Sequence, residues 1–142
     1  MAMIHLHSIT EISSFHAHIY FDPLHDKQRV ALLREHIAQR FLVQLGAVFD
    51  RPVGPHPLPM FLVVFSVPQF ATFVPWLMLN HQNLSVLVHP NTDNEKADHT
   101  HQALWLGSPV VLRNLERLPT SLKAMGYQPD AVIPNTHPTL TA

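Results

Sequence analysis

Cysteine is absent from the 142 residues, and only four glycines are present. Without cysteine the chain has no disulfides, no thiolate metal ligands and no cysteine nucleophile. Four glycines are too few for the loops that cradle phosphates, and the P-loop, the dinucleotide-binding pattern, the nucleophile elbow and the helical HExxH motif are all missing. These absences argue against thiol chemistry and against nucleotide binding.

Charge is also scarce. Charged residues make up 13% of the chain, with 9 basic residues against 10 acidic ones and no basic cluster. Because nucleic-acid binding depends on neutralising phosphates with Lys and Arg, no nucleic-acid partner is expected. So low a fraction of charged residues suggests that a second subunit covers part of the surface. We therefore expect a homodimer.

No targeting or membrane segment is expected. Residues 1–7 lack a positively charged start followed by an apolar stretch, which argues against a signal peptide. The most apolar region, 58–79, is interrupted by Pro59, Pro68 and Pro75, so it predicts a strand and a helix rather than a membrane span. Together with the missing cysteines, these features predict a cytoplasmic protein.

Hydrophobic spacing predicts the first half of a fold. Residues 15–21 alternate, with Phe15, Ala17, Ile19 and Phe21 on one side and His16, His18 and Tyr20 on the other, which is typical of a strand. Apolar residues then recur every three or four positions over 27–45, which predicts a helix that begins after Asp26 and stops at Gly46. A short strand is expected at 47–49.

The second half of the pattern repeats the first. The apolar run 60–66 predicts a buried strand, 69–80 a helix that kinks or ends early near Pro75, and 84–89 another strand. The order β-α-β-β-α-β is that of a ferredoxin-like α+β domain, an antiparallel sheet with helices on one face. The other face needs a cover, so a dimeric α/β barrel is expected.

The whole chain, residues 1–142, is expected to form a single domain, and residues from about 15 to 112 are expected to form its core. A fifth strand is expected within 103–112 and a short helix within 115–125. Residues 127–142 contain several Pro and Thr residues and predict an irregular tail.

Histidine is the residue that the chain has in excess: twelve are present. His16 and His18 share one side of the first strand, so both could bind one metal ion, although they could equally line a polar cavity. His89 ends a strand before Pro90, and His56 is held between two prolines. His99 and His101 are expected on a strand beside Asp98. Neutral imidazole is the commonest protein ligand for transition metals and also an acid–base group near neutral pH.

The segments around these histidines resemble the DOPA 4,5-dioxygenase family from about Phe15 to Gly107. They are Phe15-His16-Ala17-His18-Ile19-Tyr20-Phe21, Gly54-Pro55-His56-Pro57, the run 84–92 with Val88-His89-Pro90-Asn91-Thr92, Asp98-His99-Thr100, and Ala103-Leu104-Trp105-Leu106-Gly107. The resemblance implies a ferredoxin-like fold, usually dimeric, and extradiol cleavage of the catechol ring of L-DOPA with non-haem Fe(II) and O2. His18, His56, His89 and His99 match the family's histidine motifs.

The residues and the resemblance together predict one mechanism. His18, His56 and His89 hold the metal, His16 or His99 takes the catechol proton as general base, and Tyr20 donates a hydrogen bond to the reacting oxygen. Asp98 or His101 is expected either to bind the metal as an additional ligand or to orient a ligand histidine without binding the metal itself. Non-haem iron oxygenases commonly use two histidines and a carboxylate, whereas an all-histidine site would suit Zn(II) or Cu(II) equally well.

Two other classes of function stay open. One is a non-catalytic dimer of the same fold that binds a metal ion or a small aromatic molecule. The other is a cofactor-free member of the wider dimeric α/β-barrel group that acts on a small aromatic compound. Metal content separates them, because a cofactor-free protein would hold no stoichiometric metal.

Overall fold

The computed structural model describes all 142 residues. Short 3-10 turns flank or follow the regular elements, at Ile9–Glu11, Val67–Gln69, Leu115–Arg117 and Lys123–Met125. The regular elements are, in chain order, β1 (Ser14–Tyr20), α1 (Lys27–Arg40), β2 (Gln44–Phe49), β3 (Met60–Phe65), α2 (Phe70–Asn80), β4 (Val86–Asn91), α3 (Glu95–Asp98) and β5 (Leu104–Leu106).

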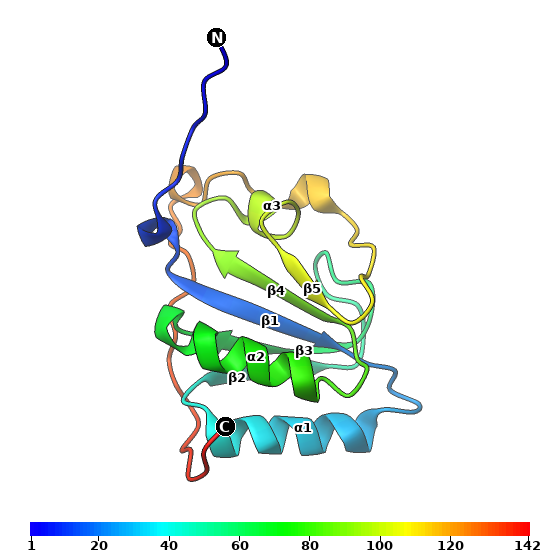
Figure 1. Ribbon diagram of the computed structural model, residues 1–142. Coiled ribbons are helices and arrows are strands. Elements are labelled where there is room, and N and C mark those ends of the chain that lie inside the picture. Colours follow the sequence, from blue (N-terminus) through cyan, green and yellow to red (C-terminus); the bar gives the residue numbers. More distant parts are fainter.

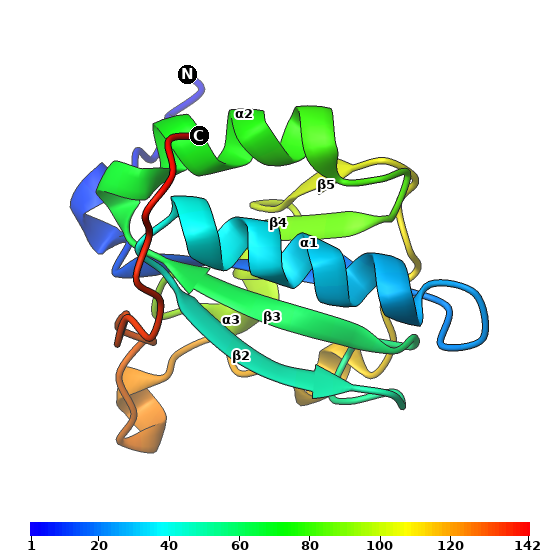
Figure 2. The ribbon, with the colours of Figure 1, turned by 90° about the horizontal axis from the view of Figure 1, so that it is seen from below.

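The five strands form one antiparallel sheet in the order β2-β3-β1-β4-β5. The predicted order β-α-β-β-α-β is confirmed, and α1 and α2 lie on the same face of the sheet (Figures 1 and 2). β1 is the central strand, hydrogen-bonded to β3 on one side and to β4 on the other. The sheet stays open and does not close into a barrel within this chain.

The main core lies between the sheet and these two helices. Ala17 and Ile19 of β1 are fully buried against this layer, as the two-residue period of the strand predicts. α1 contributes Val30, Leu33 and Ile37 at spacings of three and four residues, which places them on one face of the helix. The opposite face of β1 therefore carries His16, His18 and Tyr20.

That second face is covered largely by the chain itself. Tyr20, Met60 and Leu87 form a smaller apolar cluster there, and Trp105 and Leu112 from the segment after α3 pack against it. A bare face was one reason to expect a dimeric barrel. Because residues 103–112 already shield this face, that reason no longer holds, and the homodimer stays a prediction from composition and resemblance.

The predicted end of the first helix is wrong. α1 ends at Arg40, and Phe41 is already extended, with φ −128° and ψ 137°. Leu45 and Gly46, expected in and after the helix, lie in β2, where Leu45 pairs with Val63 of β3. The sequence misled because Phe41 and Leu45 keep a helical spacing, while the backbone of 44–49 gains its hydrogen bonds from the neighbouring strand instead.

Other boundaries also differ from expectation. α2 continues through Pro75 to Asn80 rather than ending early. The carbonyl that loses its hydrogen bond to this proline belongs to Ala71, which is exposed, so water can satisfy it. Residues 115–125 form two 3-10 turns separated by Pro119 instead of a helix.

The region around His99 differs more strongly. Residues 98–101 were expected on a strand, but Glu95–Asp98 form the short helix α3 and His99 is its C-cap. The side chain of Asn94 accepts a hydrogen bond from the backbone N–H of Ala97 at 2.9 Å, which starts this helical turn. The fifth strand is confined to three residues of the expected 103–112.

Residues 127–142 contain no helix or strand, as predicted, yet they are not detached. The tail crosses the ends of β4, β1 and β3 and finishes beside α1 (Figures 1 and 2). Thr136 is buried and its hydroxyl donates to the carbonyl oxygen of Phe41 at 2.7 Å. None of the helices combines the length and apolar character that a membrane span requires.

The turn after β5 should tolerate no side chain. Gly107 has a φ of +69°, and a Cβ there would lie 2.8 Å from the carbonyl oxygen of Leu84. Gly107→Ala is expected to lower the free energy of unfolding by about 2–3 kcal/mol, from backbone strain and this collision together. Gly126, with φ +81° and nothing within 4 Å of the added atom, is the control. Gly126→Ala should cost about 1 kcal/mol in urea denaturation; equal losses for both would contradict the collision.

Candidate metal centre

Five histidines from two strands and two connecting segments converge on the sheet face opposite the helices α1 and α2. His16 and His18 come from β1, and antiparallel pairing places His89 of β4 directly across from His16. His56 comes from the loop between β2 and β3, and His99 follows α3. The members of this histidine cluster lie between 16 and 99 in the sequence, so only the fold brings them together.

The imidazole rings are in direct contact. Ring centroids are 4.0 Å apart for His18 and His56, 4.1 Å for His89 and His99, and 5.1 Å for His18 and His89. His18, His56 and His89 are buried, whereas His16 and His99 are only partly buried. Access to the histidine cluster is therefore from the side of His16 and His99.

The loop between Pro52 and Pro59 fixes His56 before any ligand is present. Val53 and His56 form a β-bridge with two backbone hydrogen bonds, of 2.9 and 3.2 Å. The prolines on both sides of His56 restrict the backbone further. The hydroxyl of Tyr20 and Nδ1 of His56 are 2.6 Å apart and share a hydrogen bond. The imidazole is thus held at both its backbone and its ring.

Hydrogen bonds to backbone carbonyls fix two more rings. Nδ1–H of His89 donates to the carbonyl oxygen of Pro90 at 2.7 Å, and Nδ1–H of His99 donates to that of Glu95 at 2.7 Å. A carbonyl can only accept, so in both rings the lone pair is on Nε2. Histidines that ligate metals in proteins characteristically donate their other ring N–H in this way.

His18 has the most unusual environment. Its Nε2 lies 3.0 Å from Nε2 of His89, and its Nδ1 is buried without any hydrogen-bond partner. Since Nε2 of His89 carries a lone pair, His18 donates through Nε2–H and keeps its own lone pair on Nδ1. A buried nitrogen without a partner is costly, and a metal ion is one group that would satisfy it.

Burial keeps these rings uncharged. Loss of hydration lowers the pKa of His56 to about 3 and lowers the pKa of His18 and His89 well below the ordinary value, and repulsion between neighbouring imidazoles adds to both effects. The pKa of His99 is lowered mainly by burial as well. Burial also raises the pKa of Tyr20, so its phenol stays protonated. At neutral pH the histidine cluster therefore offers lone pairs, which metal binding requires.

Two sets of three rings each bring one ring nitrogen per residue within 4.8 Å of one another. One set is His16, His18 and His89, and the other is His18, His56 and His99. His18 belongs to both. The three ligands that the sequence predicted, His18, His56 and His89, all lie in the histidine cluster but are divided between the two sets.

Neither additional candidate joins these sets. Asp98 is buried, but its two oxygens accept hydrogen bonds from the backbone N–H and the hydroxyl of Thr92, at 2.8 and 2.7 Å. Burial raises the pKa of Asp98, and these bonds oppose the rise. His101 is exposed and its ring contacts only Thr100. Both sets therefore consist of imidazoles alone.

One polar partner was missed by sequence reasoning. Nε2–H of His16 donates to a carboxylate oxygen of Asp130 at 3.0 Å. The two residues are 114 positions apart, and Asp130 lies in a tail without periodicity. No sequence pattern could connect them, because the contact depends on how the tail crosses the sheet.

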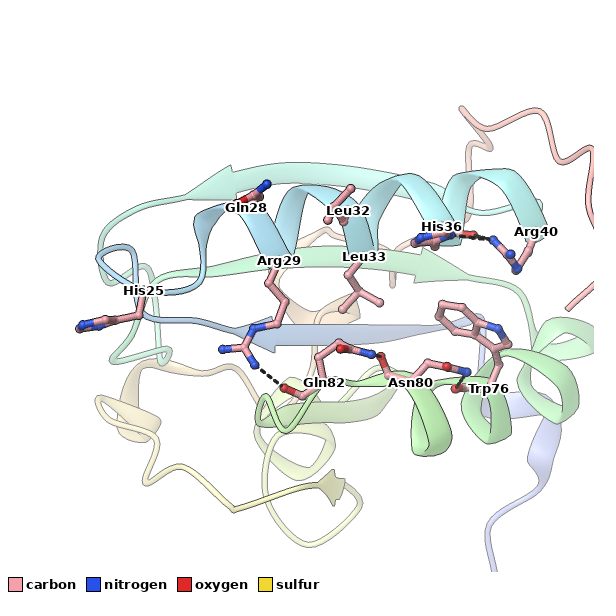
Figure 3. A pocket seen from close by; sticks show the side chains of 10 residues that line it. All are labelled: His25, Gln28, Arg29, Leu32, Leu33, His36, Arg40, Trp76, Asn80 and Gln82. Carbon is pink, nitrogen blue, oxygen red and sulfur yellow. Dashed lines mark hydrogen bonds between the residues drawn. The ribbon is translucent and has the colours of Figure 1, made fainter.

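Two surface cavities contain none of the five clustered histidines. A groove of about 560 Å³ lies between α1 and α2, on the helix side of the sheet, and Figure 3 shows the side chains that line it. Its arginines already have partners: Arg29 pairs with Asp26 and the carbonyl of Gln82, and Arg40 with His36. A second cavity of about 860 Å³ lies between residues 7–12 and α3 and borders the histidine cluster only at Pro90.

Comparisons with known proteins agree with this arrangement. The model of the Dopa 4,5-dioxygenase family matches residues 15–115, which include the whole histidine cluster. An uncharacterized 21.2 kDa protein of Botryotinia fuckeliana is 39% identical over 74% of this chain and 64% of its own length. A protein of Amanita muscaria named DOPA 4,5-dioxygenase is 35% identical over 78% of this chain and 51% of its own length. The chain thus spans between half and two thirds of the length of these relatives.

A solved structure is also similar. The crystal structure of a proposed dioxygenase from Nostoc punctiforme shares 47% sequence identity with this chain and superposes with a TM-score of 0.74. The match covers 78% of this chain and 95% of that protein. The fold and the sequence resemblance therefore extend over nearly the whole of a related protein.

The lowered pKa values predict how the metal-free protein responds to acid. Below the ordinary imidazole pKa of about 6.5, histidines in the unfolded chain bind protons, whereas the buried histidines of the folded protein stay neutral. Acid therefore favours the unfolded state. The free energy of unfolding should be at its full value above about pH 6.5 and fall towards pH 3. Each buried imidazole that stays neutral adds up to about 1.4 kcal/mol per pH unit to the slope.

Urea midpoints of the metal-free protein between pH 7.5 and pH 4 measure this slope. His56→Gln removes one group whose pKa falls to about 3 and should make the dependence shallower. His137→Gln, at an exposed position, is the control and should leave it unchanged. An identical slope in His56→Gln and the parent protein would contradict the buried neutral state.

Proposed function

The chain belongs to the Dopa 4,5-dioxygenase family, and from this premise we propose that it is a metal-dependent extradiol dioxygenase that opens the ring of a catechol such as L-DOPA. In this reaction both atoms of O2 enter the product, and the ring bond beside the two hydroxyl-bearing carbons breaks. The observation that carries the proposal is the buried cluster of neutral imidazoles, with an unpartnered ring nitrogen at His18.

The hydrogen-bond partners of the ring nitrogens favour one of the two ligand sets. His89 uses both nitrogens, one on Pro90 and one on His18, whereas the lone pair of His18 has no partner within the protein. His56 and His99 each hold a hydrogen bond at Nδ1 and have Nε2 left over. We therefore assign His18, His56 and His99 as the ligands. His89 then fixes the tautomer of His18 from outside, in place of the ligand role that the sequence predicted.

Three protein ligands fit the proposed reaction. His18, His56 and His99 would hold the ion through three imidazoles and would leave it accessible to the catechol oxygens and O2. When bound, Fe(II) would bring the catechol and O2 together and allow electrons to pass between them. Imidazole also suits Zn(II) and Cu(II), so the assignment of iron rests on the family and not on the donor atoms.

The absence of a carboxylate among the ligands favours an anionic substrate. Three neutral imidazoles leave the full charge of a divalent cation in a buried site, where charge is poorly tolerated. Asp98 cannot neutralise it, because both its oxygens hold Thr92. A catecholate would bring the missing negative charge and two adjacent oxygens with it. Charge favours an anionic substrate, and the second adjacent oxygen favours a catechol over a simple phenol, because two oxygens can bind one ion together.

Two side chains handle protons in this proposal. His16, at the partly exposed side of the histidine cluster, takes a proton from a catechol hydroxyl at its Nδ1. Tyr20 keeps its phenolic proton because burial raises its pKa. With Nδ1–H of His56 donating to the Tyr20 oxygen, the phenolic O–H is free to donate to the reacting oxygen. His99, the alternative base, is used as a ligand.

The assembly and location of the protein remain as the sequence predicts them. A homodimer and a cytoplasmic location are consistent with the low charge and the missing cysteines, and size-exclusion chromatography with light scattering would measure the former. A non-catalytic protein of the same fold is the competing function. It would hold metal and bind a catechol without consuming O2.

Metal retention distinguishes ligands from supporting residues. After anaerobic reconstitution with Fe(II), His18→Ala and His56→Ala should retain no stoichiometric metal by elemental analysis. His89→Gln should weaken binding by about 10- to 100-fold rather than abolish it, as is usual for residues that orient a ligand. The exposed His101→Gln is the matched control. Full metal occupancy in His18→Ala would show that the assignment is wrong.

Oxygen uptake with a panel of catechols tests the activity. The reconstituted protein should consume O2 and form a yellow ring-opened product from at least one catechol, including L-DOPA. Tyr20→Phe, assayed with enough Fe(II) to restore the metal content of the parent, should lower kcat by about 10- to 100-fold, the usual loss for a hydrogen bond to a charged group. Tyr127→Phe, at an exposed tyrosine, is the control. Metal binding without O2 consumption would favour the non-catalytic protein.

A further inference from the structure

The last part of the chain reaches the histidine cluster at His16. We call residues 127–142 the C-terminal strap. In Figure 1 it passes from the region of α3 across the ends of β4, β1 and β3, and Figure 2 shows it continuing to the helix side. The strap lies outside residues 15–115, the part that matches the family model.

Several hydrogen bonds hold the strap in place. Asn135 makes two side-chain bonds with the backbone of Leu45 in β2, of 2.8 and 2.9 Å, and its own backbone N–H donates to the carbonyl of Val43. At its other end the fully buried hydroxyl of Ser14 donates to the carbonyl oxygen of Asp130. Asn91 donates in turn to that hydroxyl at 2.9 Å. The backbone at Asp130 is thereby fixed to the start of β1.

The side chain of Asp130 points at one member of the histidine cluster. A carboxylate oxygen accepts Nε2–H of His16 at 3.0 Å, and the side chain of His16 is only 12% exposed. This hydrogen bond holds the pKa of Asp130 below its usual value, so the group is a carboxylate at neutral pH. Of the five rings in the histidine cluster, His16 alone is hydrogen-bonded to a carboxylate.

We propose that Asp130 is a positioning residue: it holds His16 in one orientation and one tautomer, with the lone pair on Nδ1 directed to the catechol site. The base role of His16 rests on the function proposed above, whereas its orientation by Asp130 does not. The strap therefore completes the site with a group that the family-matched part of the chain lacks.

The chemistry of a general base explains why a carboxylate is placed there. A ring that accepts a proton at Nδ1 becomes a cation, and a carboxylate on Nε2–H stabilises that cation while keeping the ring from rotating. The other acidic groups on this side cannot substitute. Asp98 is bound to Thr92, and Glu95 makes no side-chain hydrogen bond to His16. Asp130 is the one acidic group that is hydrogen-bonded to the ring.

The tautomer of His16 tests this directly, in the metal-free protein and without any assay of activity. Long-range ¹H–¹⁵N correlation spectra at pH 8 show which ring nitrogen carries the proton, and His16→Gln identifies the resonances. The parent protein should show His16 as a single Nε2–H form. In Asp130→Ala the two nitrogen shifts should move towards each other, because both tautomers become populated.

Two further variants sharpen the comparison. Asp130→Asn keeps an oxygen that can accept Nε2–H but removes the charge, so it should preserve the tautomer. Asp50→Ala removes an exposed carboxylate whose side chain makes no hydrogen bond, and it should leave the His16 shifts unchanged. Melting temperatures within a few degrees of the parent confirm that the variants are folded. An Nδ1–H form in the parent, or unchanged shifts in Asp130→Ala, would overturn the proposal.

Kinetics of the reconstituted protein then separate positioning from binding. Asp130→Ala and Asp130→Asn should both lower kcat, by about 10- to 100-fold, with metal content and KM for the catechol unchanged. A rise in KM at constant kcat would contradict the positioning role. If the parent protein shows no O2 consumption at all, the proposed dioxygenase function fails, and the tautomer measurement alone decides whether Asp130 orients His16.

Discussion

The site depends on the position of one strand. β1 is hydrogen-bonded on both sides, so its register is fixed by β3 and β4 together, and a slip by one residue would exchange its two faces. In the observed register Ala17 and Ile19 are buried under the helices, while His16, His18 and Tyr20 face the other way. The hydrophobic core therefore sets the direction of the polar groups, and the histidine cluster is a consequence of how the core packs.

Burial gives the clustered histidines their chemistry. The same loss of hydration that makes charge costly keeps His18, His56 and His89 neutral, and only neutral imidazole can ligate a metal. Backbone carbonyls fix which nitrogen of His89 and His99 carries the proton, and His89 in turn fixes that of His18. The one buried nitrogen without a partner, on His18, is the place where the protein alone does not satisfy its own hydrogen-bonding groups.

The open face of the sheet is closed by segments that come from outside the β-α-β-β-α-β unit. Residues 103–112 cover Tyr20 and Leu87, and the C-terminal strap carries Asp130 to the edge of the histidine cluster. A single chain can thus bury three imidazoles and partly bury two more on a face that a simpler domain would expose. Of these two segments, residues 103–112 lie within the family-matched region 15–115 and the C-terminal strap lies after it.

The sequence by itself determined the strands and helices whose period is unambiguous and the faces of β1, because strand alternation is a local property. The histidine motifs also singled out the five rings that lie together in the structure. The sequence did not determine the end of α1, the helical turn before His99 or the division of ligands into two sets, since these depend on pairing partners distant in the chain. The contact between Asp130 and His16 was decided only by tertiary structure: 114 residues separate them, and no local pattern encodes such a distance.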